Sequence, residues 1–110
     1  GHAVAVSVRL KGDPLPEAVM AALEAWVPEP QCLGLPSAPE RSIRLHRAED
    51  RPQVRRDVER DGGMSVHVGR VRRCPILGIK FTLLGHNTER GAAGGSLLNA
   101  ELALASGVIR

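Results

Sequence analysis

Apolar residues alternate with small or polar ones in four short stretches, and this period of two restricts the fold more than any other feature of the sequence. The stretches are residues 3–10, 42–46, 64–73 and 79–83. In the first, three valines and Leu10 fall on one side and smaller or polar residues on the other, which is the pattern of a strand with one buried face. A short interruption separates the last two stretches, so they are expected to pair as an antiparallel hairpin.

Two helices are predicted to accompany these strands. Apolar residues at helical spacing run from Val19 to Val27, and the prolines that follow end this helix because proline lacks the amide donor. A second helix is expected over residues 88–106, before Gly107, since glycine readily adopts the left-handed conformation of a helix C-cap. Strands and helices together predict an α+β fold, with a mixed or mainly antiparallel sheet of about four strands backed by helices.

Two segments between these elements are predicted to be loops. Residues 28–40 hold four of the eight prolines, too many for the interior of a helix or strand. Residues 47–63 are charged and aperiodic, and they end in an Asp-Gly-Gly turn signal. Long loops are unusual in a small domain and often make contacts or carry function.

The positive charge of the chain is concentrated in its central third. The formal net charge is +3, while residues 41–73 carry ten basic and five acidic side chains. The acids cancel half of that basic charge, and no aromatic side chain is available there to stack on a base. We therefore expect an arginine-rich segment that is ion-paired at the surface or at a subunit contact, and no nucleic-acid partner.

The sequence gives no sign of a membrane or of an oxidising compartment. It has no apolar run of about 18 residues and no signal-peptide pattern at its start. Cys32 and Cys74 stand alone, so neither a disulfide framework nor a zinc motif is indicated. A reduced, cytoplasmic protein that does not bind a membrane is expected.

The four histidines are candidate chemical groups because imidazole titrates near neutral pH. His2 precedes a strand, His46 ends one, His67 lies within one, and His86 lies in the turn before the last helix. No two of them are at a ligand spacing along the sequence. Four solvated or structurally bonded side chains, and no metal site, are therefore expected.

The last predicted helix has an unusual start and an unusually wide apolar face. Three glycines fall within residues 91–95, where each costs about 1 kcal/mol against alanine in a helix interior. Free amides at such a start attract anions, and tight packing against another domain would explain the glycines equally well. The leucines between Leu97 and Leu104 spread over more of the helix than one short edge helix needs, so a partner for this helix is expected.

Four strings of residues occur in an order that resembles one enzyme family. They are DRPQ at 50–53, GGMSV at 62–66, VGRVR at 68–72 and HNTERGAAG at 86–94. In this order, and with a Gly-His pair before a first strand, they resemble the archaeal and fungal branch of the aspartate-semialdehyde dehydrogenases. Malonyl-coenzyme A reductases of the same superfamily are the main alternative.

The resemblance implies the C-terminal portion of a cytoplasmic NADP-dependent enzyme of lysine, threonine and methionine biosynthesis. That enzyme reduces aspartyl phosphate through a cysteine thioester, and its C-terminal domain is similar to that of glyceraldehyde-3-phosphate-dehydrogenase-like enzymes. The resemblance assigns His2 as the general acid/base and places Asn87, Gly91 and Gly94 near the nicotinamide end of the cofactor.

The resemblance also implies partners that residues 1–110 lack. The family's nucleophilic cysteine lies in an N-terminal nucleotide-binding domain, and neither cysteine here matches its motif, so this chain alone is expected to bind no cofactor and to be inactive. A homodimer or tetramer through the sheet is implied, with helix 88–106 packed on the missing domain. Two other classes remain open: a stand-alone assembly module without catalysis, and a small anion-binding domain that uses its arginines.

Overall fold

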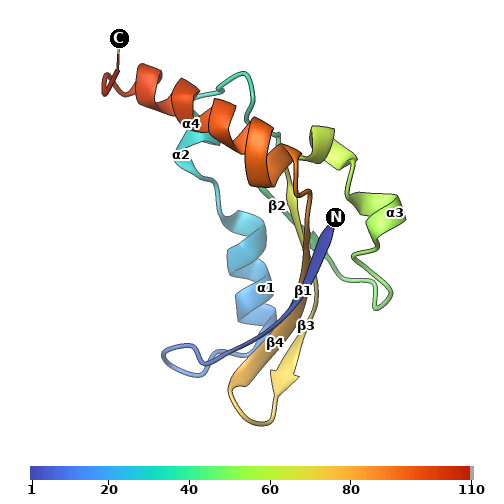
Figure 1. The fold of residues 1–110 in the computed structure, drawn as a ribbon. Coiled ribbons are helices and arrows are strands. Elements are labelled where there is room, and N and C mark those ends of the chain that lie inside the picture. The colour runs from blue at the N-terminus through green and yellow to red at the C-terminus, as the bar shows by residue number, and fades with distance from the viewer. Residues whose placement is uncertain (110) are drawn as a thin grey trace.

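The computed structural model describes residues 1–109, which form a four-stranded sheet with helices at its margins (Figure 1). In chain order the elements are β1 (His2–Val8), α1 (Pro16–Ala25), α2 (Glu29–Cys32), β2 (Ile43–His46), α3 (Val54–Asp57), the 3-10 turn η1 (Arg60–Gly63), β3 (Val66–Cys74), β4 (Gly78–Gly85), the π-type turn η2 (Glu89–Ala93) and α4 (Gly94–Ala105).

The sheet has the order β1-β4-β3-β2. β4 pairs antiparallel with both β1 and β3, whereas β2 and β3 run parallel. The predicted mixed sheet and the predicted hairpin of β3 and β4 are therefore confirmed. Because β1 lies beside β4, the first residues of the chain meet the segment that leads into the last helix, and His2 is opposite Gly85.

Both segments predicted to be loops contain short helices, which the prediction of loops there had missed. Residues 28–40 include α2, and residues 47–63 include α3 and η1. Elements of four residues are too short to show a period in the sequence. Asp61 and Gly62 adopt positive φ angles of 55° and 64°, which turns the chain back toward β3.

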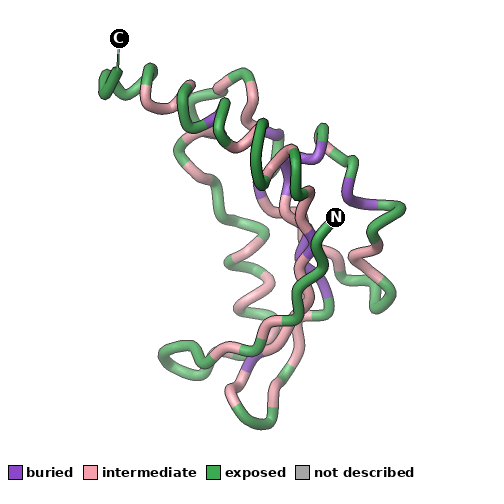
Figure 2. Tube along the Cα trace, viewed as in Figure 1, coloured by how far each residue is buried: buried purple, intermediate pink, exposed green. Residues whose placement is uncertain are grey.

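Most of the core lies at one end of the sheet, where residues 47–63 and the start of α4 meet the strands (Figure 2). The buried apolar side chains there are Val58, Met64, Val68, Leu84 and Leu98, whereas buried Ile79 lies toward the other end, opposite Val8 and Arg73. α1 packs against β2 and β3, so it leaves β1 and β4 uncovered on the face where Val4 is paired with Leu83 and Val6 with Phe81. Val4 is 41% exposed, and this face is an apolar surface without a partner in residues 1–109.

The predicted last helix is confirmed, although its first turn is wider than an α-helical one. η2 leads directly into α4, and Gly107 follows with a φ of 78°. α4 extends away from the sheet (Figure 1), and it leaves Leu97 55% and Leu104 58% exposed. Ser37 in the proline-rich segment donates from its backbone amide and its hydroxyl to the Glu101 carboxylate, at 2.9 and 2.7 Å, which ties α4 to the rest of the chain.

Within residues 1–109, every helix is too short or too polar to span a lipid bilayer.

Candidate functional site

His2 and Asn87 meet at the edge of the sheet, although 85 positions separate them in the sequence. The pairing of β1 with β4 places His2 opposite Gly85, and two residues later the Asn87 side chain reaches the histidine ring. The amide Nδ2 donates to His2 Nδ1. The structure therefore brings together two of the residues that the sequence singled out, and both are exposed.

His86 holds the turn that presents Asn87. Its Nδ1 accepts hydrogen bonds from the backbone amides of Thr88 and Glu89, at 3.3 and 3.2 Å, and its Nε2 lies 3.2 Å from Glu59 Oε1. A ring that accepts at Nδ1 carries its proton on Nε2, which then donates to the carboxylate. His86 thus satisfies amides at a helix start and links them to the arginine-rich segment, a role that its position in the sequence did not reveal.

The glycines of the helix start face different surroundings. Gly91 is exposed, and it lines a shallow polar hollow of about 200 Å³ together with Arg90, Ala92, Gly95, Ser96 and Asn99. Gly94 faces inward, because a Cβ there would overlap Met64 Sδ and lie 3.1 Å from the Glu89 carbonyl oxygen. Close packing inside the chain therefore already requires glycine at position 94, whereas Gly91 remains open to a ligand or another domain.

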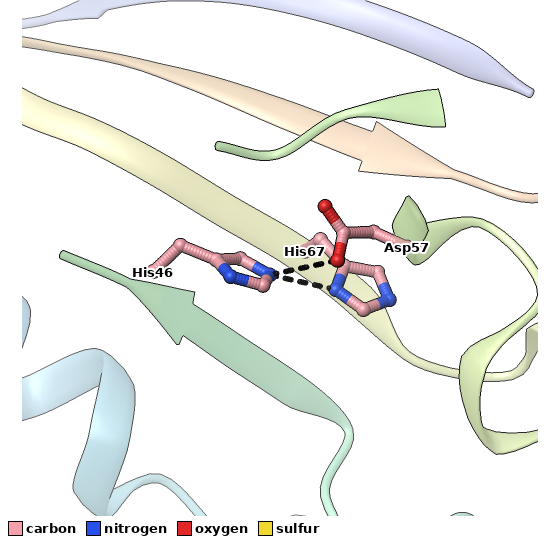
Figure 3. Close-up of side chains that lie close together, drawn as sticks. All are labelled: His46, Asp57 and His67. Atoms are coloured by element: carbon pink, nitrogen blue, oxygen red, sulfur yellow. Dashed lines mark hydrogen bonds and ion pairs between the residues drawn. The ribbon is translucent and has the colours of Figure 1, made fainter. Parts of the chain in front are cut away.

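A second polar cluster lies on the parallel strands β2 and β3 (Figure 3). His46 Nε2 is 2.9 Å from His67 Nδ1 and 3.9 Å from Asp57 Oδ1. The two rings are stacked, with centroids 5.2 Å apart and planes at 25°. His67 and Asp57 are completely buried, and His46 retains a little exposure.

Hydrogen bonds from the chain itself hold the Asp57 carboxylate in place. Arg51 donates to both oxygens, through Nε at 2.9 Å and through Nη2, and the Gln53 amide donates at 2.7 Å. The Arg51 guanidinium holds the pKa of the Asp57 carboxyl well below its usual range. Burial lowers the pKa of His46 and of His67, so the cluster contains an ionised carboxylate and two neutral imidazoles near pH 7.

Ion pairs engage six of the ten arginines in residues 41–73, in line with the expected ion-paired segment, and two of the six pair with acids outside it. The six are Arg44, Arg47, Arg51, Arg56, Arg60 and Arg73. Arg44 donates to both oxygens of Asp61, through Nη2 at 2.8 Å and through Nε, and the Ser65 hydroxyl donates to Asp61 at 2.7 Å. The hydrogen bond from Arg44 lowers the pKa of Asp61 to about 2. Its arginines are therefore largely engaged by carboxylates of the same chain.

Spacing along the sequence gave no sign of the contact between His46 and His67. The two residues are 21 positions apart and lie on strands whose parallel pairing the sequence did not predict. Once the register of β2 and β3 is known, the contact follows from the alternation of side chains along a strand. Arg44 is the partner of His67 in that register, and position 46 faces the same side of the sheet as position 44.

Comparison with known proteins gives consistent matches. Residues 1–90 match the sequence model of a family described as semialdehyde dehydrogenase, dimerisation domain. The chain is 45% identical over 113 residues to an aspartate-semialdehyde dehydrogenase of Trichophyton rubrum, a match that covers 99% of this chain and 31% of that protein. It is 44% identical to the enzyme of the same name from Archaeoglobus fulgidus, with 99% and 31% covered.

A solved structure shares the fold. The crystal structure of aspartate semialdehyde dehydrogenase with NADP from Candida albicans superposes with a TM-score of 0.87 at 38% identity, covering 97% of this chain and 30% of that one. A second structure, of aspartate semialdehyde dehydrogenase II from Vibrio cholerae, gives a TM-score of 0.69 at 28% identity. The chain therefore spans about 31% of the length of the curated relatives that it matches.

Proposed function

We propose that this chain, which belongs to the semialdehyde dehydrogenase dimerisation-domain family, is part of an NADP-dependent aspartate-semialdehyde dehydrogenase. It would serve as the C-terminal catalytic and dimerisation portion of that enzyme. The reaction is the reductive dephosphorylation of aspartyl phosphate, a step of amino-acid biosynthesis. The contact between His2 and Asn87 at the edge of the sheet carries the proposal, because it places an exposed imidazole beside the glycine-rich helix start. A reactive cysteine and the nucleotide-binding surface belong to the second domain of such an enzyme.

In this proposal His2 is the general acid/base of the site. With the amide as it stands, Asn87 Nδ2 donates to His2 Nδ1, which puts the proton of the neutral ring on Nε2. The general-base role uses the other orientation of the amide, in which Asn87 Oδ1 accepts from Nδ1 and leaves Nε2 free to take up the thiol proton; the imidazolium so formed can return a proton from Nε2 as a general acid. Asn87 is thus a positioning residue for proton transfer at Nε2.

The helix start fits the proposed contact with NADP at Gly91. The hollow beside Gly91 is lined by small and polar residues, Gly91 among them. A larger side chain at position 91 would therefore narrow the hollow, and even its Cβ would be 3.4 Å from the His86 carbonyl oxygen. Gly94 acts indirectly, because its packing against Met64 sets the position of the turn. NADPH, when bound, supplies hydride; Asn87 and Gly91 shape the edge of its site.

The family's dimerisation role implies self-association, and we assign a homodimer or tetramer to the uncovered face of the sheet. The paired side chains of Val4, Val6, Phe81 and Leu83 provide apolar area for such a contact. The exposed leucines of α4 are assigned to the nucleotide-binding domain, so that helix 88–106 joins the two domains. Cys32 and Cys74 are both free, which supports a reducing compartment such as the cytoplasm.

A chimaeric enzyme tests the proposal. This chain replaces the segment of the Candida albicans enzyme on which it superposes, and NADP reduction is followed with aspartate semialdehyde and phosphate. Measurable turnover, absent from the 110-residue chain alone, is the expected result. A chimaera that sediments as a folded dimer and binds NADP but has no turnover would contradict the proposal.

A further inference from the structure

The cluster of His46, Asp57 and His67 has no part in the chemistry assigned to His2. It lies on β2, β3 and α3, and β4 separates β3 from the strand that carries His2. Each of the three residues offers one ligand atom, and these three atoms all lie within 4.8 Å of one another (Figure 3). We take them to be His46 Nε2, His67 Nδ1 and Asp57 Oδ1, from the distances between them. Two imidazole nitrogens and one carboxylate oxygen around a single point are a donor set typical of transition-metal sites.

The distances between these donors are close to those that a metal ion requires. Bonds of about 2.0–2.2 Å from a tetrahedral Zn²⁺ ion place neighbouring ligand atoms roughly 3.3 Å apart. The two imidazole nitrogens are 2.9 Å apart, and His46 Nε2 is 3.9 Å from Asp57 Oδ1. Small rotations of His46, the most exposed of the three side chains, bring the donors to these positions. We propose that His46 Nε2, His67 Nδ1 and Asp57 Oδ1 bind a divalent transition-metal ion of the zinc type.

The surroundings of Asp57 are those of a metal-binding carboxylate. Arg51 Nε and the Gln53 amide both donate to Oδ2, and Arg51 Nη2 donates to Oδ1, so a metal ion would share Oδ1 with this guanidinium and use its second lone pair. Hydrogen bonds from such outer groups orient metal ligands in known sites. Nitrogen donors disfavour Mg²⁺ and Ca²⁺, which prefer all-oxygen sites.

Hydrogen bonding within the chain does not account for His67. Its Nδ1 faces His46, and its Nε2 is buried without a partner among residues 1–109. Either tautomer of the histidine pair leaves this nitrogen unpaired, and buried polar atoms without partners are rare in folded proteins. A metal ion at Nδ1 leaves Nε2 as the protonated and still unpaired nitrogen, so the positions of the three donor atoms, and not this atom, point to the site.

An ion reaches the cluster past His46. This side chain lines two surface hollows, of about 460 and 260 Å³, the second of which it shares with Arg60. Arg60 Nη1 is 4.0 Å from Asp57 Oδ1, and the Arg60 side chain is 46% exposed. Its positive charge opposes a cation in the cluster, so Arg60 limits the affinity of the site without being needed for the fold.

The bound ion would connect β2, β3 and α3. α3 belongs to the segment that also carries Glu59, the partner of His86 at the start of the last helix. Metal binding therefore tightens the segment that supports the turn holding Asn87. This consequence places the ion in a structural role, distinct from proton transfer at His2.

The test uses the 110-residue chain without a tag, with its cysteines reduced, and Zn²⁺ as the probe. Long-range ¹H–¹⁵N NMR spectra of the imidazoles report each ring nitrogen during the titration. The expected result is a one-to-one change at His46 Nε2 and His67 Nδ1, with the signals of His86 unchanged. No change at His46 and His67 at saturating Zn²⁺, or changes confined to His2 and His86, would overturn the proposal.

Three variants give a second readout, from competition between the chain and a chelator for Zn²⁺. His46→Asn removes one ligand and weakens binding by about tenfold or more. Arg60→Gln removes the opposing charge and tightens binding by about threefold, a gain that misfolding cannot produce. Asp13→Asn, at a 76% exposed carboxylate that is paired with Arg73 away from the cluster, is the control and leaves the affinity unchanged. Affinity in His46→Asn equal to that of the parent chain would show that the ion binds elsewhere, and unchanged affinity in Arg60→Gln would count against the assigned position.

Discussion

The two polar sites of this chain differ in what completes them. At the edge of the sheet, His2 and Asn87 are exposed and touch each other, beside a helix whose Leu97 and Leu104 are more than half exposed. In the cluster formed by β2, β3 and α3, Asp57 and His67 are buried and their neighbours come from the same chain. Under the proposed function the first site is completed by another domain, whereas the contacts of the second lie within this chain.

The largest expected loss in the free energy of unfolding comes from a substitution in the buried site. Asp57→Asn leaves the Arg51 guanidinium without its charged partner, and removing one member of a buried ion pair costs about 3–5 kcal/mol. Urea unfolding followed by circular dichroism measures this loss. Asp50→Asn is the matched control, because Asp50 is 66% exposed and 3.9 Å from Arg56, so little change is expected. Equal losses in the two variants would show that the Asp57 cluster is not the centre of stability.

Substitutions of Gly91 and Gly94 at the helix start should affect the stability of the chain differently. Gly94→Ala forces a Cβ onto Met64 and should lower the free energy of unfolding by about 1–3 kcal/mol, as overpacking usually does. At Gly91 a Cβ would make only an ordinary contact, 3.4 Å from the His86 carbonyl oxygen, so Gly91→Ala should leave the isolated chain unchanged or stabilise it by up to about 1 kcal/mol. Thermal and urea unfolding of both variants are the measurements. A loss in Gly91→Ala as large as in Gly94→Ala would contradict the different surroundings assigned to them.

The pH dependence of stability should come from the buried site. The lowered pKa values of His46 and His67 mean that the unfolded chain binds more protons, so stability falls as the pH drops below about 6.5. The lowered pKa values of Asp57 and Asp61 add a further loss below about pH 4. Urea midpoints at pH 7.5 and 5.5, measured with a chelator present, test the first window. We expect His46→Gln to lose less over this interval than the parent, and an identical loss would refute the assignment.

The smallest effect on stability is expected at the exposed site. Asn87→Ala removes one hydrogen bond that water can replace, so the urea midpoint should change little. In the chimaeric enzyme the same change should lower kcat and shift its pH profile, since the tautomer of His2 is no longer fixed. A large loss of stability with an unchanged pH profile would assign Asn87 a structural role instead.

The sequence predicted the strands whose apolar residues alternate clearly. It did not predict the parallel pairing of β2 with β3 or the side-chain contacts that follow from that pairing. The alternation in residues 3–10, 64–73 and 79–83 was enough to predict β1 and the hairpin of β3 and β4. The partnership of β2 with β3 joins strands with an intervening segment of short helices, which local patterns do not reveal. The contact of His46 with His67 follows from that partnership, and so it could not be predicted.

The exposed site was predictable for a different reason. His2 and the residues from Asn87 to Gly94 stood out through a resemblance in residue strings, and the structure adds that they are neighbours. The sequence could not separate Gly91 from Gly94, because the contact of Gly94 with Met64 joins segments about 30 positions apart. Which glycine faces a ligand depends on tertiary packing.

The most direct test of the account is the turnover of the chimaeric enzyme with His2→Asn. If His2 is the general acid/base, kcat should fall by about 10²–10⁴-fold, while the dimer, the urea midpoint and the dissociation constant of NADP remain those of the parent chimaera. A kcat within about twofold of the parent value, with its pH profile intact, would contradict the account and leave the exposed edge of the sheet without its proposed role in proton transfer.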